Sequence, residues 1–187
     1  MNSRIRALLS FGAFALMGSL MAGTVWWSWD QAQREPQQEV IDDLNTTATM
    51  NSWYVCGFTD GCDWPQSVKS GAFRIGVLDQ PELLKFLMSN CHLNQIGNQV
   101  IEVQAAPESP SDAFFHILCV GDVESDAWKA YVDDRPTLIV TLNASGITEG
   151  AVVNIDNVGG RAVIQIDSER AAELQISIGN ELKSWGQ

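Results

Sequence analysis

The alternation of apolar and polar residues is clearest near the C-terminus, from Glu149 to Trp185. Two apolar runs, Ala151–Ile155 and Ala162–Ile166, flank a glycine- and asparagine-bearing segment, and this pattern predicts the two strands of a hairpin. The spacing then becomes helical, which predicts one amphipathic terminal helix that Asp167 or Ser168 caps at its start. The apolar positions of this expected helix are Ala171, Leu174, Ile178, Leu182 and Trp185.

Upstream of the hairpin, short apolar runs of strand length alternate with segments of helical periodicity. Their order predicts a single α/β domain with a mixed β-sheet flanked by helices, followed by the C-terminal β-hairpin and helix. Gly57 and Gly61 are expected to end the first helix, because glycine is a poor helix former. The expected elements are helix Glu39–Phe58, strand Phe73–Leu78, a helix beginning at Pro81, strands Asn98–Gln104 and Phe115–Gly121, helix Glu124–Val132 and strand Leu138–Leu142.

The N-terminal segment has the charge pattern of an export signal. Arg4 and Arg6 precede an uncharged apolar run, Ala7–Trp27, which is long enough to span a bilayer. Residues 1–29 are therefore either a cleaved signal peptide or a retained membrane anchor, residues 30–38 a polar linker, and residues 39–187 the α/β domain. In both cases the domain is expected outside the cytoplasm, soluble or anchored to the membrane, with membrane contact only if the segment is uncleaved.

The composition narrows the classes of partner. The chain has 187 residues and a formal net charge of -12, which argues against nucleic acid as a partner because phosphates would be repelled. The length is sufficient for one globular domain with a hydrophobic core.

Four cysteines are the first candidates for chemistry. Cys56 and Cys62 bracket a short glycine-bearing loop, so a disulfide between them is one expectation in an oxidising compartment. Cys91 and Cys119 could form a second pair only if the end of a helix packs over the strand that holds Cys119. All three pairings of the four residues remain open.

Catalytic, metal and cofactor sites have little support in the sequence. Cys91-His92 offers ligand types, but adjacent side chains point apart, and there is no Cys-x-x-Cys pair to anchor zinc. The chain lacks a Gly-x-Ser-x-Gly nucleophile motif and a lysine-bearing phosphate loop. His116 is interpreted as a hydrogen-bonded structural side chain rather than a general base. We therefore expect no enzyme activity, no cofactor and no metal.

A partner or ligand surface is the remaining kind of site. Asn143 and Ser145 lie in the loop that follows the strand Leu138–Leu142, and Asn154 and Arg161 lie on the hairpin. Loops presented by a rigid scaffold often carry binding residues. The structural alternative is a solvated arginine and a hydrogen-bonding asparagine near a turn.

Several fragments, in one order and spacing, resemble the YfiR-like family of exported bacterial regulators. The resemblance runs from about Trp53 to Leu182. The sequence departs from the family pattern at Cys56-Gly57, at Glu149 and at Gly179-Asn180. The fragments that carry the resemblance are Phe58 with Trp64-Pro65, Phe73–Leu78, Phe115–Cys119, Asp134–Leu138, Gly146-Ile147, Glu149–Ile155, Ile166-Asp167, Ala171, Ile176 and Ile178–Leu182.

The resemblance implies a non-enzymatic periplasmic regulator. In this family a member restrains an inner-membrane diguanylate cyclase, thereby altering cyclic-di-GMP and biofilm formation, and responds to redox state through disulfides. The implied partner is an inner-membrane sensor protein of the diguanylate cyclase or histidine kinase class, and a homodimer is left open. The alternative function is a periplasmic small-molecule (solute) binding module, because an α/β domain can present a cleft at its strand ends.

Overall fold

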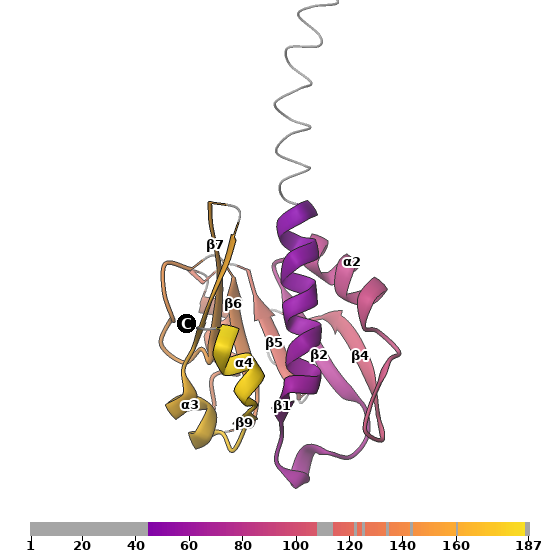
Figure 1. Ribbon diagram of the computed structural model, residues 1–187. Helices are drawn as coiled ribbons and strands as arrows, with labels where there is room; N and C mark the ends of the chain where they lie inside the picture. Colours follow the sequence, from indigo (N-terminus) through magenta and orange to yellow (C-terminus); the bar gives the residue numbers. More distant parts are fainter. Residues whose placement is uncertain are drawn as a thin grey trace, which may run out of the picture. The chain divides into compact units, whose positions relative to one another are not determined.

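The computed structural model describes residues 45–107, 114–121, 123–124, 126–133, 135–142, 144–159 and 161–185 (Figure 1). The expected signal or anchor, the linker and the start of the first helix lie outside these residues. No helix within the described ranges is long and apolar enough to cross a membrane.

A seven-stranded mixed sheet with the order β3-β4-β2-β5-β6-β7-β8 forms the centre of the domain. Its five inner strands run parallel, and the two outer strands, β3 and β8, pair antiparallel with their neighbours. This arrangement confirms the expected α/β class. The strands are β2 Phe73–Leu78, β3 Gln95–Ile96, β4 Gln99–Ala105, β5 Ile117–Val120, β6 Leu138–Leu142, β7 Val153–Val158 and β8 Arg161–Ile166.

Helices cover the two faces of the sheet unequally. The first helix (helical over residues 45–61), α2 (Pro81–Asn90) and α4 (Asn180–Trp185) lie on one face (Figure 1). Their apolar side chains pack there with inward side chains of the sheet such as Ile117 and Cys119. The other face carries a smaller apolar cluster, in which Leu118 meets the short 3-10 helix η2 (Asp126–Tyr131). Successive strand residues point to opposite faces, so the central strands are buried on both sides.

The prediction of a single terminal helix is wrong. The chain forms α3 (Ser168–Glu173), leaves the helical conformation at Gln175, whose φ is 58°, and then forms strand β9 (Ser177–Ile178) before α4. The interruption allows β9 to pair antiparallel with β1 (Cys62–Asp63) at the end of the first helix. Four of the five residues of the apolar stripe are nevertheless buried and Trp185 is half-buried, because α3, β9 and α4 together present the stripe to the core. The predicted cap is confirmed: Asp167 accepts a hydrogen bond from the backbone N–H of Arg170 at 2.9 Å.

The first helix continues through Gly57 and ends at Gly61, three residues beyond the expected end at Phe58. The two glycines face α4: a Cβ at Gly57 would lie 2.8 Å from the ring of Trp185, and one at Gly61 would lie 2.5 Å from Cγ of Leu182. The absence of side chains lets the two helices approach closely. These glycines therefore serve packing, a role that their poor helix propensity does not reveal.

Two smaller differences concern local geometry. The segment expected as a helix over Glu124–Val132 is a single six-residue 3-10 element, η2. The strands of the hairpin are longer than the apolar runs suggested: Val158 pairs with Arg161, so β7 continues through Asp156 and Asn157. The polar residues Asp156 and Asn157 thus belong to β7, which the pattern of apolar runs did not indicate.

Candidate functional site

Three of the four cysteines converge on one region of the core. Cys56 comes from the first helix, Cys91 caps the C-terminal end of α2, and Cys119 lies in β5. The hydrogen bond between the first two thiols, together with burial, raises the pKa of Cys56, and the same hydrogen bond lowers the pKa of Cys91. Burial raises the pKa of Cys119, which is fully buried. The two hydrogen-bonded sulfurs therefore form a thiol pair that could be oxidised together.

The fourth cysteine lies apart from this pair. Cys62 belongs to β1, opposite Ile178 of β9, and burial raises the pKa of its thiol to about 12. All four cysteines are free thiols in this structure. The arrangement brings Cys56 to Cys91, whereas the pairings weighed from the sequence joined Cys56 to Cys62 and Cys91 to Cys119.

A cleft of about 620 Å³ opens where the first helix ends, beside β1, β9 and the turn between β3 and β4. Its lining mixes acidic, basic and amide side chains, among them Asp60, Asn98 and the ion pair between Lys69 and Asp63. The indole of Trp64 forms one wall, and its Nε1 has no hydrogen-bond partner among the described residues. The cleft is suited to a polar molecule with a flat apolar part.

His116 has the structural role interpreted from the sequence. Its Nδ1 accepts the backbone N–H of Arg74 at 3.0 Å, and its Nε2 lies 2.9 Å from the carbonyl oxygen of Val68. Burial lowers the pKa of the imidazole, which favours the neutral ring that these two contacts require. The ring also stacks on Phe73 with the centroids 4.3 Å apart. Both nitrogens are thus occupied, and neither is free for proton transfer.

The four residues expected on a partner surface have different environments. Ser145 and Arg161 are exposed, and Asn143 lies outside the described residues. Asn154 is fully buried and contributes no surface. Its Nδ2 donates to the carbonyl of Ala144 at 2.9 Å, and its Oδ1 accepts from the hydroxyl of Thr141. The side chain holds the start of the β6–β7 loop against β7, which corrects its assignment to the surface.

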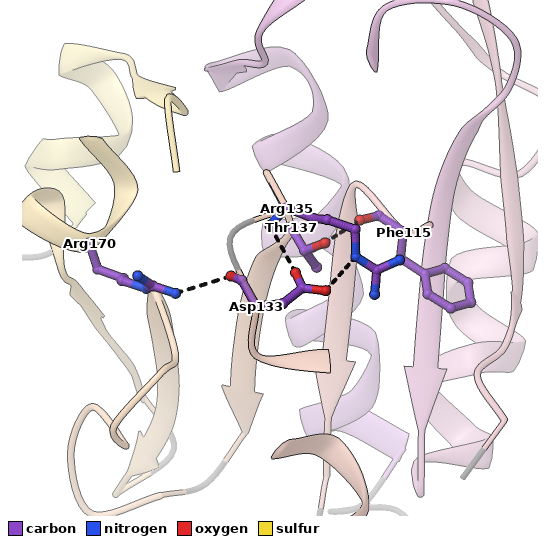
Figure 2. Close-up of polar contacts among 5 residues, drawn as sticks. All are labelled: Phe115, Asp133, Arg135, Thr137 and Arg170. Atoms are coloured by element: carbon purple, nitrogen blue, oxygen red, sulfur yellow. Dashed lines mark hydrogen bonds and ion pairs between the residues drawn. The ribbon is translucent and has the colours of Figure 1, made fainter. Parts of the chain in front are cut away.

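A polar network that the sequence did not indicate joins α3 to the entrance of β6 (Figure 2). Arg170 donates to the carbonyl oxygen of Asp133, whose carboxylate in turn binds the backbone N–H and the guanidinium of Arg135. Thr137 donates to the carbonyl oxygen of Phe115 at 2.9 Å and so continues the network to β5. The contacts from Arg170 to Asp133 and from Thr137 to Phe115 join residues 37 and 22 positions apart, which explains why spacing alone gave no signal of the network.

Within the described ranges, no group of three or more histidine, cysteine or acidic side chains could hold a metal ion. The polar side chains at the centre of the domain form structural hydrogen bonds. These features define a class of protein: a one-domain α/β scaffold with an open mixed sheet, a thiol pair and a polar cleft.

The sequence profile of a family described as YfiR/HmsC-like matches residues 48–184. This match covers most of the chain, and the protein belongs to that family. The family is regulatory and non-catalytic, is periplasmic, and acts in diguanylate cyclase signalling together with a membrane protein. None of the curated proteins compared with the chain matches it.

Proposed function

We propose that this protein is a non-enzymatic periplasmic regulator that binds and restrains an inner-membrane signalling protein of the diguanylate cyclase or histidine kinase class. The observation that carries the proposal is the family match, which spans residues 48–184 and hence almost the whole described domain. The neutral imidazole of His116 makes a hydrogen bond at each ring nitrogen, which agrees with a protein that acts by binding rather than by catalysis.

Exposed apolar side chains on the hairpin and the β6–β7 loop are the favoured contact surface. Val158 at the end of β7 is 58% exposed, and Ile147 in the loop is 37% exposed. Exposed apolar side chains that gather on neighbouring segments often mark contact sites. Ser145 and Arg161, both exposed, add polar groups to the same two segments.

Site-specific photocrosslinking in intact cells tests this surface. A photoreactive residue at Ile147 or Val158 is expected to capture an inner-membrane protein with a cyclase or kinase domain. Leu93, 68% exposed on the turn after α2, provides the matched control position. Deletion of the gene that encodes this protein should raise the cellular concentration of cyclic-di-GMP if the partner is a cyclase. Capture of no such membrane protein, or equal capture at Leu93, would contradict the proposal.

The regulator is redox-tuned in this proposal, with Cys56 and Cys91 as the pair that is oxidised. A small-molecule disulfide such as oxidised glutathione accepts the two electrons. One protein thiolate attacks a sulfur of the oxidant, which forms a mixed disulfide and releases one glutathione thiolate. The second protein thiolate then attacks the protein sulfur of the mixed disulfide, which forms the Cys56–Cys91 bond and releases the other glutathione thiolate. The hydrogen bond between the two thiols supports this pairing.

Mass spectrometry of the protein after peptide digestion tests the pairing. Treatment with oxidised glutathione should produce a Cys56–Cys91 linked peptide in wild type, and Cys56→Ser should abolish it. Cys62→Ser is the control, because Cys62 lies in β1, apart from the thiol pair. A bridge formed instead between Cys56 and Cys62 would refute the pairing and leave the partner-binding proposal standing.

The second candidate function is a solute-binding module, favoured by the cleft beside β1 and β9. Thermal-shift measurements with polar aromatic metabolites of the envelope would detect such a ligand as a concentration-dependent rise in Tm. Lys69→Ala should weaken the response if the ligand occupies the cleft, whereas Lys85→Ala, on the exposed side of α2, should not. Absence of any shift would leave partner binding as the function.

A further inference from the structure

The strand β8 forms one outer edge of the seven-stranded sheet. The backbone N–H of Asp167 donates to the carbonyl of Val152 at 2.8 Å, which makes Val152 and Asp167 a hydrogen-bonded pair of the β7–β8 ladder. Because bonded and non-bonded pairs alternate in an antiparallel ladder, Arg161, Val163 and Gln165 direct their backbone groups toward β7. The backbone groups that point away from the sheet belong to the alternate residues Ala162, Ile164 and Ile166.

This edge lacks two features that often prevent strands from associating, a proline and several charged side chains. It is six residues long, contains no proline and carries one charged residue, Arg161. Val163, on its exposed face, is 42% accessible. Exposed strand edges of this kind are templates for another strand. The opposite edge differs, since β3 is only two residues long.

We propose that β8 pairs antiparallel with β8 of a second copy of this chain, about a two-fold axis at Ile164. The outward backbone groups can pair only with one another, so the axis must bring even-numbered residues of the two strands together. An axis at Ile164 places Ala162 opposite Ile166 of the partner subunit and Ile164 opposite its own copy. Each of the three residues then exchanges both backbone hydrogen bonds with the other strand.

Charge selects this register among the neighbouring ones. On the exposed face, the axis at Ile164 places Arg161 opposite the partner subunit's Asp167, and the two-fold symmetry repeats the contact. Arg161 makes no ion pair within the described part of the chain. Asp167 uses one carboxylate oxygen to cap α3 and keeps the other available. An axis at Val163 would instead place Arg161 opposite the neutral Gln165 of the partner subunit.

The association is specific to a second copy because the strand is complementary to itself. Both members of the proposed ion pair lie within or directly after β8, and Asp167 still continues the ladder through its bond to Val152. A strand from an unrelated protein could use the outward backbone groups, but it would match both Arg161 and Asp167 only by coincidence. Self-pairing would join two sheets into one continuous sheet across the two-fold axis.

A charge-swap experiment on the full chain, purified in a mild detergent and followed by sedimentation velocity, tests the pairing. Wild type should form a dimer. Arg161→Glu and Asp167→Lys each replace two attractive contacts by two repulsive ones, and each should raise the Kd of the dimer at least about tenfold. An equimolar mixture of the two variants should regain the dimer, because opposite charges then meet at both positions. Arg161→Lys should dimerise like wild type.

Backbone and register variants keep the test decisive if Asp167→Lys loses its helix cap and unfolds. Ala162→Pro removes an outward N–H without touching the β7 ladder and should give a folded monomer. Cysteines placed singly at Val163 and Gln165 should crosslink when the two variants are mixed, and neither should crosslink with itself. A wild type that stays monomeric, a mixture that does not regain the dimer, or an edge occupied only by a different envelope protein would each overturn the proposal.

Discussion

Replacing Gly61 by alanine tests the close approach of the first helix and α4. The added Cβ would lie 2.5 Å from both Cγ and Cδ1 of Leu182 and 2.9 Å from its Cδ2, well inside van der Waals contact. Leu182 is buried, so its side chain cannot swing into solvent. The backbones cannot separate easily either, because Gly179 donates to the carbonyl of Gly61 at 2.9 Å and Cys62 pairs with Ile178 immediately beside the contact.

The size of the effect follows from two opposing contributions. Overpacking a filled site costs about 1–3 kcal/mol. Replacing glycine by alanine in a helix favours folding by up to about 1 kcal/mol, and less here because Gly61 is the last helical residue. We therefore expect Gly61→Ala to lower the free energy of unfolding by about 1–2 kcal/mol. Gly146→Ala is the matched control, because nothing lies within 4 Å of its added Cβ and its φ is not in the left-handed region.

Urea unfolding followed by tryptophan fluorescence provides the measurement. With a slope of about 2 kcal/mol/M, Gly61→Ala should lower the midpoint by about 0.5–1 M without changing the slope. Leu182→Ala alone should cost about 2–5 kcal/mol, but in the double variant the new methyl group occupies part of the space, so the two losses should not add. Additive losses, or a Gly61→Ala midpoint equal to that of wild type, would refute the close helix–helix contact.

Three further variants test separate features of the fold. Asn154→Ala should cost about 1–3 kcal/mol in urea unfolding, because it leaves the buried carbonyl of Ala144 and the hydroxyl of Thr141 without this partner; Gln165→Ala, an exposed neighbour, should cost much less. Burial lowers the pKa of His116 below its unfolded value of 6.5, so the unfolded chain binds more protons below that pH. Stability should thus be retained above about pH 6.5 and fall as the pH drops toward the folded pKa, and His116→Gln should flatten that pH dependence, whereas an unchanged slope would contradict it. Asp167→Ala should cost about 1 kcal/mol through loss of the α3 cap, and Asp167→Asn should restore most of it, as followed by thermal unfolding.

The strands could be predicted from the sequence because their signal is local. Phe73–Leu78 and Leu138–Leu142 are short apolar runs, and the structure has strands at those same residues. The terminal segment carried an equally clear signal of helical periodicity, but that signal reports which side chains are buried and not whether the backbone stays helical. The pairing of β9 with β1 depends on a segment more than a hundred residues upstream, and no local pattern contains that information.

The candidate site was harder to predict from the sequence, again because local patterns do not contain long-range contacts. Cysteine spacing suggested Cys56 with Cys62, because six residues along the chain are easily bridged by a loop. In the structure these residues instead belong to a continuous helix and the strand after it, which directs Cys56 toward the end of α2 and Cys91. The signal that could have indicated this lies in the helical phase: Cys56 follows the fully buried Val55 directly, on the edge of the apolar stripe.

Burial also explains what family membership transfers to this chain and what it does not. Several residues that carry the resemblance are interior ones: Trp64 is 4% exposed, His116 is 2% exposed and Asn154 is fully buried. Their hydrogen bonds and ring contacts stabilise the sheet and its loops, so matching them specifies the scaffold. Val158 and Arg161, which are exposed, lie outside those fragments, whereas the exposed Ile147 lies within one of them. The fold therefore follows directly from the resemblance, whereas the proposed partner contact rests on exposed side chains of the hairpin and the β6–β7 loop, which crosslinking at Ile147 and Val158 tests.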